Sequence, residues 1–280
     1  MSQLSTAGPS TGPTPGGSPS VGHYRPATWW DAIRSEWVKL RSLRSMTICS
    51  IITAVLAIGI GVLVCSIVAS RSNHTTNTDP TTLSLAGLAL GQLAVAILAV
   101  LGVASEYASG TISVSLLAVP KRTRFFLCKL GVITALCLVL GEVLSFVAFG
   151  IGQAILHGNY HSASLSQPHV ARAVIGAGLY IAAIGLLSAG LGFLFRSTAA
   201  GVAVVVGVVF VLPDIIVPIV DGVAGTHIAK YWPTLAGERI FTVTPGGSDV
   251  MAPWTGFLVM LALVAAVVVA AWVVLEARDV

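Results

Sequence analysis

The sequence predicts an all-α polytopic membrane protein, and its composition and its long uncharged stretches carry this prediction. Of the 280 residues, 55% are hydrophobic and only 9% are charged, with a mean hydropathy of +0.91. A soluble domain carries about 25% charged residues. No charged residue occurs in 46–69 or 255–275. Each of these stretches is long enough, at roughly 1.5 Å per residue, to cross a hydrocarbon core of about 30 Å.

The chain before the first span divides into a tail and an amphipathic segment. Residues 1–28 are mostly Ser, Thr, Gly and Pro without an apolar run, which is typical of a disordered tail rather than a signal peptide. Residues 29–44 fit an interfacial helix with tryptophans towards lipid and cations towards anionic headgroups. They also fit a plain juxtamembrane tether. The predicted apolar face consists of Trp30, Ile33, Trp37 and Leu40, and the basic residues include Lys39 and Arg41.

Six apolar segments follow, and together they predict six transmembrane helices. Because no loop between them is long enough for an independent domain, residues 29–280 form a single transmembrane domain. The spans are expected at about 46–69, 83–104, 125–156, 173–195, 199–220 and 254–275.

The distribution of Lys and Arg predicts the orientation. With the N-terminus inside, eleven basic residues lie on the inner side and four on the outer side, and basic residues are enriched in cytoplasmic loops. Both termini are therefore predicted inside, with an inner loop at 105–124 and the largest outer segment at 221–253. The inner set is Arg25, Arg34, Lys39, Arg41, Arg44, Lys121, Arg122, Arg124, Lys129, Arg196 and Arg278, and the outer set is Arg71, Arg172, Lys230 and Arg239.

The fifth span contains two prolines near its outer end, Pro213 and Pro218. Each proline removes a backbone donor and disfavours a straight helix, so we expect a broken helix there. Freed carbonyls at membrane depth are tolerated only beside protein or a water-filled cavity. The break therefore predicts that this part of the span faces the bundle or a pathway. Further on, 226–241 is expected to form a short re-entrant or surface helix.

Several function classes are disfavoured because their motifs are missing. None of the four lysines follows a glycine, so there is no phosphate-binding G-x-x-x-x-G-K-[ST] loop. The four cysteines lack C-x-x-C spacing, and His157, His161 and His169 lack a completing ligand, so no metal site is indicated. Because the membrane topology explains the excess of basic residues, nucleic acid binding is not implied. We expect no catalytic site and no cofactor bound by this chain.

The loop between the second and third spans has a distinctive order of residues. Glu106 lies at the inner mouth of span two, Gly110 permits a sharp turn, and Thr111 can cap a following helix. Pro120 closes that segment. Lys121, Arg122, Arg124 and Lys129 then form a cationic collar at the start of span three.

This loop resembles the permease subunits of type-2 ATP-binding-cassette (ABC) exporters, especially actinobacterial ones. Their E-Y-x-x-G-T-I motif is followed by Leu-x-Ala-x-Pro-x-Arg and a lysine, and the run at 35–42 is similar to their N-terminal element. Ser113 departs from the pattern, because relatives often have arginine there. The matching residues are Glu106, Tyr107, Gly110, Thr111, Ile112, Leu117, Ala118, Pro120, Arg122 and Lys129.

The resemblance implies that the loop forms a coupling helix that docks on a separate nucleotide-binding ATPase subunit, which holds ATP and Mg. It also implies a second permease subunit, as a homodimer or with a sister chain, in a bacterial plasma membrane. Drugs, peptides and lipids all fit an apolar pathway. Read without the resemblance, Glu106 and Gly110 simply end span two. The implied ATPase-coupling residues are Glu106, Tyr107, Gly110, Thr111, Pro120 and Arg122.

Two acidic residues within the spans leave alternative functions open. Glu142 and Asp214 lie roughly 26 Å and 23 Å from the inner ends of their spans, in the outer half of the bilayer. They would recognise cationic substrates or gate protons, or they would be hydrogen-bonded or hydrated structural residues. A proton-coupled secondary transporter that uses both acids, and a non-transporting membrane scaffold, are the alternatives to an exporter permease.

Overall fold

The structure is a computed structural model that describes residues 28–70, 78–118, 121–158, 160–220, 223–243 and 251–277. The predicted disordered tail, apart from Thr28, lies outside the described residues, and so does Pro120. The described part of the chain is helical and contains no strand.

Six helical segments are long and apolar enough to cross a membrane, which confirms the predicted fold class. They match the six predicted spans, with small extensions at several ends. The spans are α2 (Arg44–Ser70), α3 with α4 (Pro80–Leu85 and Leu88–Ala108), α6 (Arg122–Leu156), α7 (Val170–Phe195), α8 with η1 and α9 (Thr198–Ala203, Val204–Val211 and Leu212–Ile219) and α12 (Pro253–Ala277). The shorter helices are α1 (Trp29–Ser42), α5 (Thr111–Ala118), α10 (Val223–Tyr231), α11 (Pro233–Gly237) and η2 (Glu238–Phe241).

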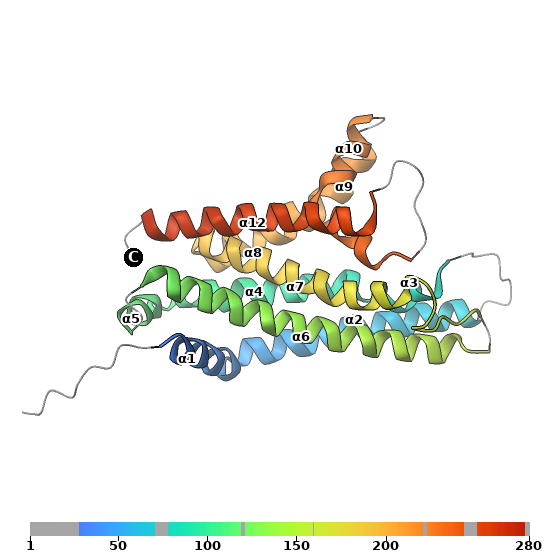
Figure 1. Ribbon diagram of the computed structural model, residues 1–280, viewed down its shortest axis with the longest axis horizontal. Helices are drawn as coiled ribbons and strands as arrows, with labels where there is room; N and C mark the ends of the chain where they lie inside the picture. The colour runs from blue at the N-terminus through green and yellow to red at the C-terminus, as the bar shows by residue number, and fades with distance from the viewer. Residues whose placement is uncertain are drawn as a thin grey trace, which may run out of the picture.

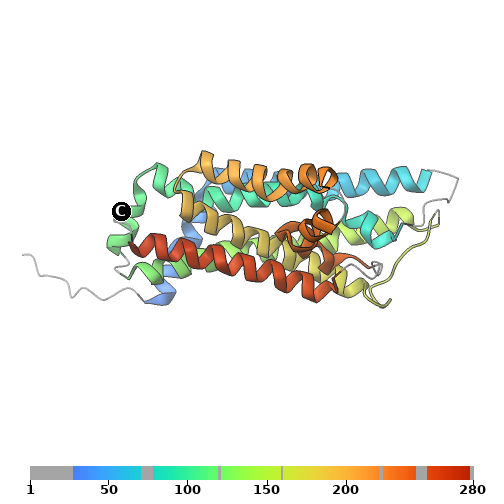
Figure 2. The same ribbon diagram turned by 90° about the horizontal axis from the view of Figure 1, so that it is seen from above.

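The spans run side by side along the long axis of the molecule (Figure 1). The helices α1 and α5 and the C-terminal end of α12 lie at one end, which we call the α5 end; α3 and α10 lie towards the other, the α3 end. In the centre, α7 packs against α6, α4 and α12, while α2 packs against α4 and α6. The fifth span contacts α4 and α7 and runs along one edge of the bundle (Figure 2).

Glycines allow the central helices to approach closely. A side chain at Gly87 or Gly91 of α4 would meet Ala57 of α2, and a side chain at Gly185 of α7 would meet the Cys137 sulfur of α6. These small residues therefore serve packing within the chain, one of the two roles that such spacings have in membrane helices.

The fifth span departs from α-helical geometry before its first proline rather than between its two prolines. Residues Val204–Val211 form a π-helix, and Pro213 and Pro218 both lie in α9, which stays helical to Ile219. The predicted break at 212–218 is thus wrong in position. Proline has no backbone N–H group, and its ring crowds the carbonyl four residues earlier, here that of Val209. The helical hydrogen bonds are therefore disturbed upstream of Pro213.

The segment after the fifth span stabilises this irregular backbone. The Trp232 indole donates to the Val209 carbonyl (2.9 Å), and the buried Thr234 hydroxyl lies 3.3 Å from the same oxygen. The carbonyl that Pro213 would leave unpaired therefore faces protein, as predicted for this side of the span. The short helix expected at 226–241 is three helical pieces, α10, α11 and η2, all of which contact α12, α10 the least.

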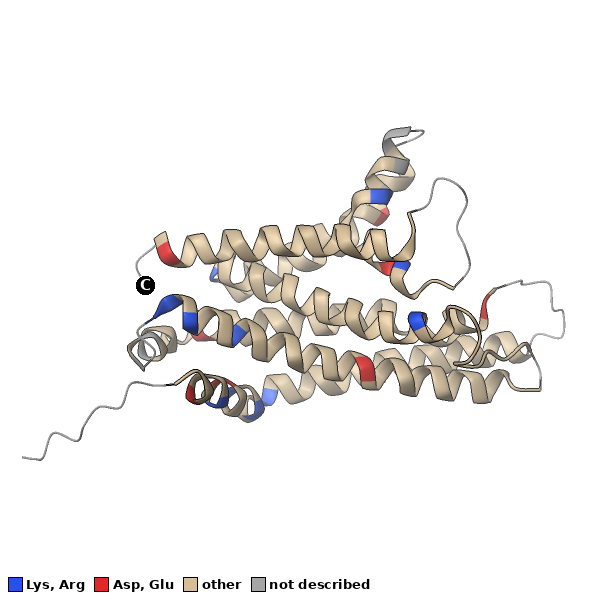
Figure 3. Cartoon of the chain, viewed as in Figure 1, with Lys and Arg blue, Asp and Glu red and all other residues tan. Residues whose placement is uncertain are grey.

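Charged residues gather at the two ends of the bundle (Figure 3). Of the Lys and Arg residues in the described ranges, nine belong to the α5 end, namely Arg34, Lys39, Arg41, Arg44, Lys121, Arg122, Arg124, Lys129 and Arg196. Three belong to the α3 end, namely Arg172, Lys230 and Arg239. Arg25, Arg71 and Arg278 lie outside the described residues.

Candidate functional site

Helix α1 docks on the bundle through one narrow face. Its start is fixed by a capping box, in which the Thr28 amide donates to the Asp31 carboxylate (3.0 Å) and the Asp31 amide donates to the Thr28 hydroxyl (3.3 Å). Ala32, Glu36 and Leu40, spaced four residues apart, are its buried residues. They place α1 against α6 and, to a smaller extent, α2.

The face of α1 that meets the protein is not the predicted apolar face. Trp30 is 71% exposed and Trp37 is 45% exposed, whereas Leu40 is buried. The physical reason is that Ala32 allows close approach and Glu36 pairs with the buried Lys129 of α6, so the docking face is centred on Glu36. The two tryptophans point away from the protein and remain available to the membrane interface, which suits an interfacial helix.

Four charged side chains meet where α1, α4 and α6 come together, and we call Glu36, Lys39, Glu106 and Lys129 the charged cluster. The Lys129 ammonium lies 2.6 Å from a Glu36 oxygen and 2.8 Å from a Glu106 oxygen. The Lys39 ammonium lies 2.6 Å from the other Glu36 oxygen and 3.4 Å from Glu106. Two carboxylates thus share two ammonium groups, and the four side chains come from three different helices.

Burial makes these pairings strong constraints on structure. The side chains of Lys129 and Glu36 are 2% and 4% exposed, while that of Lys39 is 39% exposed. Burial alone would raise the pKa of Glu36, but the charge of Lys129 and hydrogen bonds from both lysines hold that pKa below its ordinary value. Burial would lower the pKa of Lys39, but the hydrogen bond to Glu36 and the charges of both carboxylates raise it above its ordinary value. Glu36 and Lys39 are therefore expected to be charged near neutral pH.

The charged cluster also holds α5, the helix predicted to contact a partner. The Lys39 ammonium donates to the Ser115 hydroxyl of α5 (3.0 Å). Gly110 reverses the chain between α4 and α5 with a φ of +69°, in the left-handed region that favours glycine. Ile112 is buried and anchors α5, whereas Leu117 is 79% exposed. One end of α5 is thus fixed to α1 and α4 while part of its surface stays free.

Tyr107 extends the site towards the turn between the fourth and fifth spans. Its ring packs edge-on against Phe193 with ring centroids 6.3 Å apart. The Arg196 guanidinium lies 5.5 Å from the Tyr107 ring centroid, a cation–π arrangement. Arg196 also donates to the Val274 carbonyl of α12 (3.2 Å), so this pair connects α4, α7 and α12.

The other predicted coupling residues lie near the cluster but outside it. Thr111 is the first residue of α5 rather than its N-cap, and its hydroxyl lies 2.9 Å from that of Ser109. Arg122 donates to the Leu275 carbonyl of α12 (3.3 Å), and Arg41 is an exposed residue in the last turn of α1. Of the predicted set, the charged cluster therefore contains Glu106 from the loop and Lys39 from the interfacial helix.

The sequence does not predict that Glu36, Ser115 and Lys129 meet in this site. It places Glu36 in the N-terminal element, and Lys129 in the cationic collar and in the motif, without pairing them. The available signal was an acid, Glu36, spaced four residues from Ala32 and from Leu40 on a helix, which is the pattern of a buried carboxylate. That pattern does not say which of the many nearby cations is the partner.

A second polar cluster lies towards the α3 end and consists of Gln92, Tyr180 and Glu238. The buried Tyr180 hydroxyl donates to the Gln92 side-chain oxygen (2.5 Å), and Glu238 lies 3.4 Å from the Gln92 amide. Burial raises the pKa of Glu238, the Gln92 hydrogen bond opposes this, and the charge of Asp214 raises it further. The predicted pathway residue Asp214, exposed on α9, is therefore electrostatically linked to Glu238, which sequence reasoning missed.

Glu142, the other acid predicted within a span, lies elsewhere. It is half-buried on α6 and packs where Gly178 of α7 leaves room for its carboxyl group. Within the part of the chain that the structure describes, α6 and α9 share no extensive packing that would bring Glu142 and Asp214 together. Among the residues that the structure describes, no three His, Cys, Asp or Glu side chains are grouped as metal ligands.

These features define a polytopic membrane protein in which α1 is joined by buried ion pairs to the end of α4 and the start of α6. The family model described as "ABC-2 family transporter protein" matches residues 32–214, from the buried face of α1 to α9. The chain belongs to this family and is a membrane permease of an ABC transporter. A comparison with curated proteins finds no match.

Proposed function

We propose that this chain exports its substrate by using ATP hydrolysed on a separate nucleotide-binding ATPase that docks on α5. The observation that carries the proposal is the charged cluster, because Glu36, Lys39, Glu106 and Lys129 fix α1, α4 and α6 to each other and Lys39 reaches Ser115 of α5. A push on α5 would therefore act on two spans and on the interfacial helix at once. ATP and Mg would be held by the ATPase, and this chain would bind no cofactor.

The distribution of basic residues supports an orientation with the α5 end in the cytoplasm. Cytoplasmic segments carry an excess of Lys and Arg, and nine of the twelve described basic residues belong to this end. In this orientation α5 faces the compartment that contains ATP. We further propose a bacterial plasma membrane, both termini inside, and outward movement of the substrate.

An exposed apolar face on the fifth span supports a second permease subunit, either another copy or a sister chain. Val208, Val211, Ile215 and Ile219 are each at least 44% exposed, and Asp214 lies among them. Lipid would cover an apolar face, but an acid on that face favours protein or a water-filled cavity. Drugs, peptides and lipids remain the candidate substrates.

The test is reconstitution with the partner ATPase and measurement of ATPase activity and transport together. Glu106→Ala should preserve membrane insertion but reduce the stimulation of ATP hydrolysis by substrate, because it removes a link between α4 and the lysines of α1 and α6. Arg34→Ala, an exposed cation on α1, serves as the control. Normal coupling in the Glu106 variant would contradict the proposal. Transport that stops on collapse of the proton gradient with ATP still present would favour a secondary transporter instead.

A further inference from the structure

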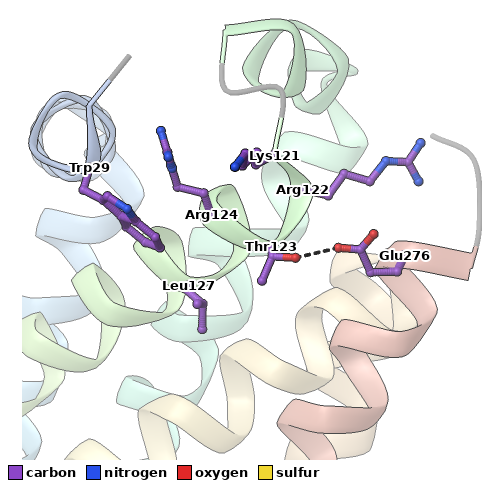
Figure 4. Close-up of a pocket in the computed structure, with 7 residues that line it drawn as sticks. All are labelled: Trp29, Lys121, Arg122, Thr123, Arg124, Leu127 and Glu276. Carbon is purple, nitrogen blue, oxygen red and sulfur yellow. Dashed lines mark hydrogen bonds between the residues drawn. The ribbon is translucent and has the colours of Figure 1, made fainter. Parts of the chain in front are cut away.

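A cavity of about 670 Å³ opens at the α5 end between α1, α6 and α12. We call it the Trp29 pocket. The pocket is separate from the charged cluster, because no residue of that cluster lines it. Its lining residues are Trp29, Lys121, Arg122, Thr123, Arg124, Leu127 and Glu276 (Figure 4).

The lining of the Trp29 pocket carries an excess of positive charge. It includes three cations and one carboxylate, and that carboxylate, Glu276, accepts a hydrogen bond from the Thr123 hydroxyl (2.8 Å). Arg124 lies on the side of Trp29, with its guanidinium 5.1 Å from the Trp29 ring centroid, and Lys121 lies between Arg124 and Arg122 (Figure 4). Arg122 extends towards the end of α12. The pocket is therefore suited to an anionic group beside Trp29.

The pocket changes from cationic to apolar along α6. Leu127 follows Arg124 by about one helical turn, so it lies further along α6 from the α5 end (Figure 4). Its side chain is 49% exposed. Beside it on α12, the Trp272 indole lies 3.4 Å from the Thr123 hydroxyl, and Val269 and Val273 are exposed. Tryptophans at this level are typical of the boundary between headgroups and acyl chains.

We propose that the Trp29 pocket binds the headgroup of an anionic phospholipid from the membrane leaflet at the α5 end. Lys121 and Arg124 bind the phosphate, and Trp29 and Trp272 lie at the level of the glycerol backbone. The acyl chains run along Leu127 and the exposed apolar residues of α12. A soluble phosphate would use only the cationic half of this arrangement, so the apolar half favours a lipid.

The first experiment uses the full chain purified in detergent, with lipid binding measured by native mass spectrometry. The probes are phosphatidylglycerol, phosphatidylcholine and soluble glycerol phosphate. Phosphatidylglycerol should bind at least about fivefold more tightly than phosphatidylcholine, because each basic residue near the headgroup contributes about this factor. Equal binding of the two lipids would overturn the proposal, and so would glycerol phosphate that displaces phosphatidylglycerol at equal concentration.

The second experiment separates this pocket from the general positive charge of the α5 end. Lys121→Gln with Arg124→Gln should weaken phosphatidylglycerol binding about 25-fold. Phosphatidylcholine binding should weaken much less, because the choline cation opposes the charge of the phosphate that both lipids carry. The control is Arg34→Gln with Arg44→Gln, which removes the same charge from exposed positions outside the pocket and should change binding less than twofold. Equal losses in both double variants would overturn the proposal. If phosphatidylglycerol shows no preference in any variant, an acidic protein surface becomes the better candidate for this pocket.

Discussion

The charged cluster predicts that its two lysines contribute unequally to stability. Lys129 is 2% exposed and contacts Glu36 at 2.6 Å and Glu106 at 2.8 Å. Lys129→Met would leave Glu106, among the described residues, with Lys39 at 3.4 Å as its remaining cationic partner. Removing one partner of a buried ion pair costs about 3–5 kcal/mol, because a buried charge remains uncompensated.

Lys39→Met is the matched comparison, since it removes the same kind of group from the same cluster. The Lys39 side chain is 39% exposed and Lys129 would remain against both carboxylates, so the expected loss is about 1 kcal/mol. The free energy of unfolding can be measured by titrating the purified protein in mild detergent with a denaturing detergent and following tryptophan fluorescence. Arg34→Met, at an exposed position, gives the baseline.

A double variant tests whether the loss comes from the orphaned carboxylate. Combining Lys129→Met with Glu106→Gln should cost less than the sum of the single changes, by about 0.5–3 kcal/mol, because the neutral amide no longer needs the ammonium group. Two results would refute the reasoning. One is an equal loss for Lys129→Met and Lys39→Met, and the other is strict additivity in the double variant.

Three further predictions concern pH, topology and the pathway. Ionised Glu36 stabilises the fold above its ordinary pKa of 4.5, and this contribution is lost as pH falls through the lower folded-state pKa. The free energies of unfolding of Glu36→Gln and wild type, measured across pH, should therefore differ least in acid. In a cysteine-free variant, an impermeant thiol reagent added to intact cells should label His227→Cys and not Ser113→Cys; the opposite pattern would reverse the orientation. Asp214→Asn should lower transport of cationic substrates relative to neutral ones, and an unchanged ratio would show that Asp214 recognises no charge.

The sequence predicts the spans well because hydrophobic length is a local property. The uncharged run at 46–69 needs no knowledge of its neighbours to be recognised as a membrane helix, and the structure extends it only to Arg44–Ser70. Glu106 and Gly110 are also local signals, since one ends a span and the other supplies the left-handed residue of a turn. Local chemistry therefore identifies the inner loop as a distinct element.

Pairing across the bundle is what the sequence does not reveal. Glu36 and Lys129 are 93 residues apart, and many cations at the same end offer equivalent partners for Glu36. The fifth span gives a similar lesson. Its prolines predict an irregular helix, but not the groups that satisfy its backbone: Trp232 and Thr234, which bind the Val209 carbonyl, come from another segment.

Helix α4 connects the two polar clusters, and this arrangement relates the α5 end of the bundle to the part nearer the α3 end. Glu106 and Gln92 lie near its opposite ends, roughly 21 Å apart along the helix axis. At the α5 end, Lys39 lies between Ser115 of α5 and Glu106 of α4, and buried Lys129 ties Glu106 to α6, so a displacement of α5 would act on α4. A shift of α4 as a rigid rod would reach Gln92 and then Glu238. Because the segment that contains Glu238 also binds the fifth span, movement at the proposed ATPase contact would be transmitted to the span that carries Asp214.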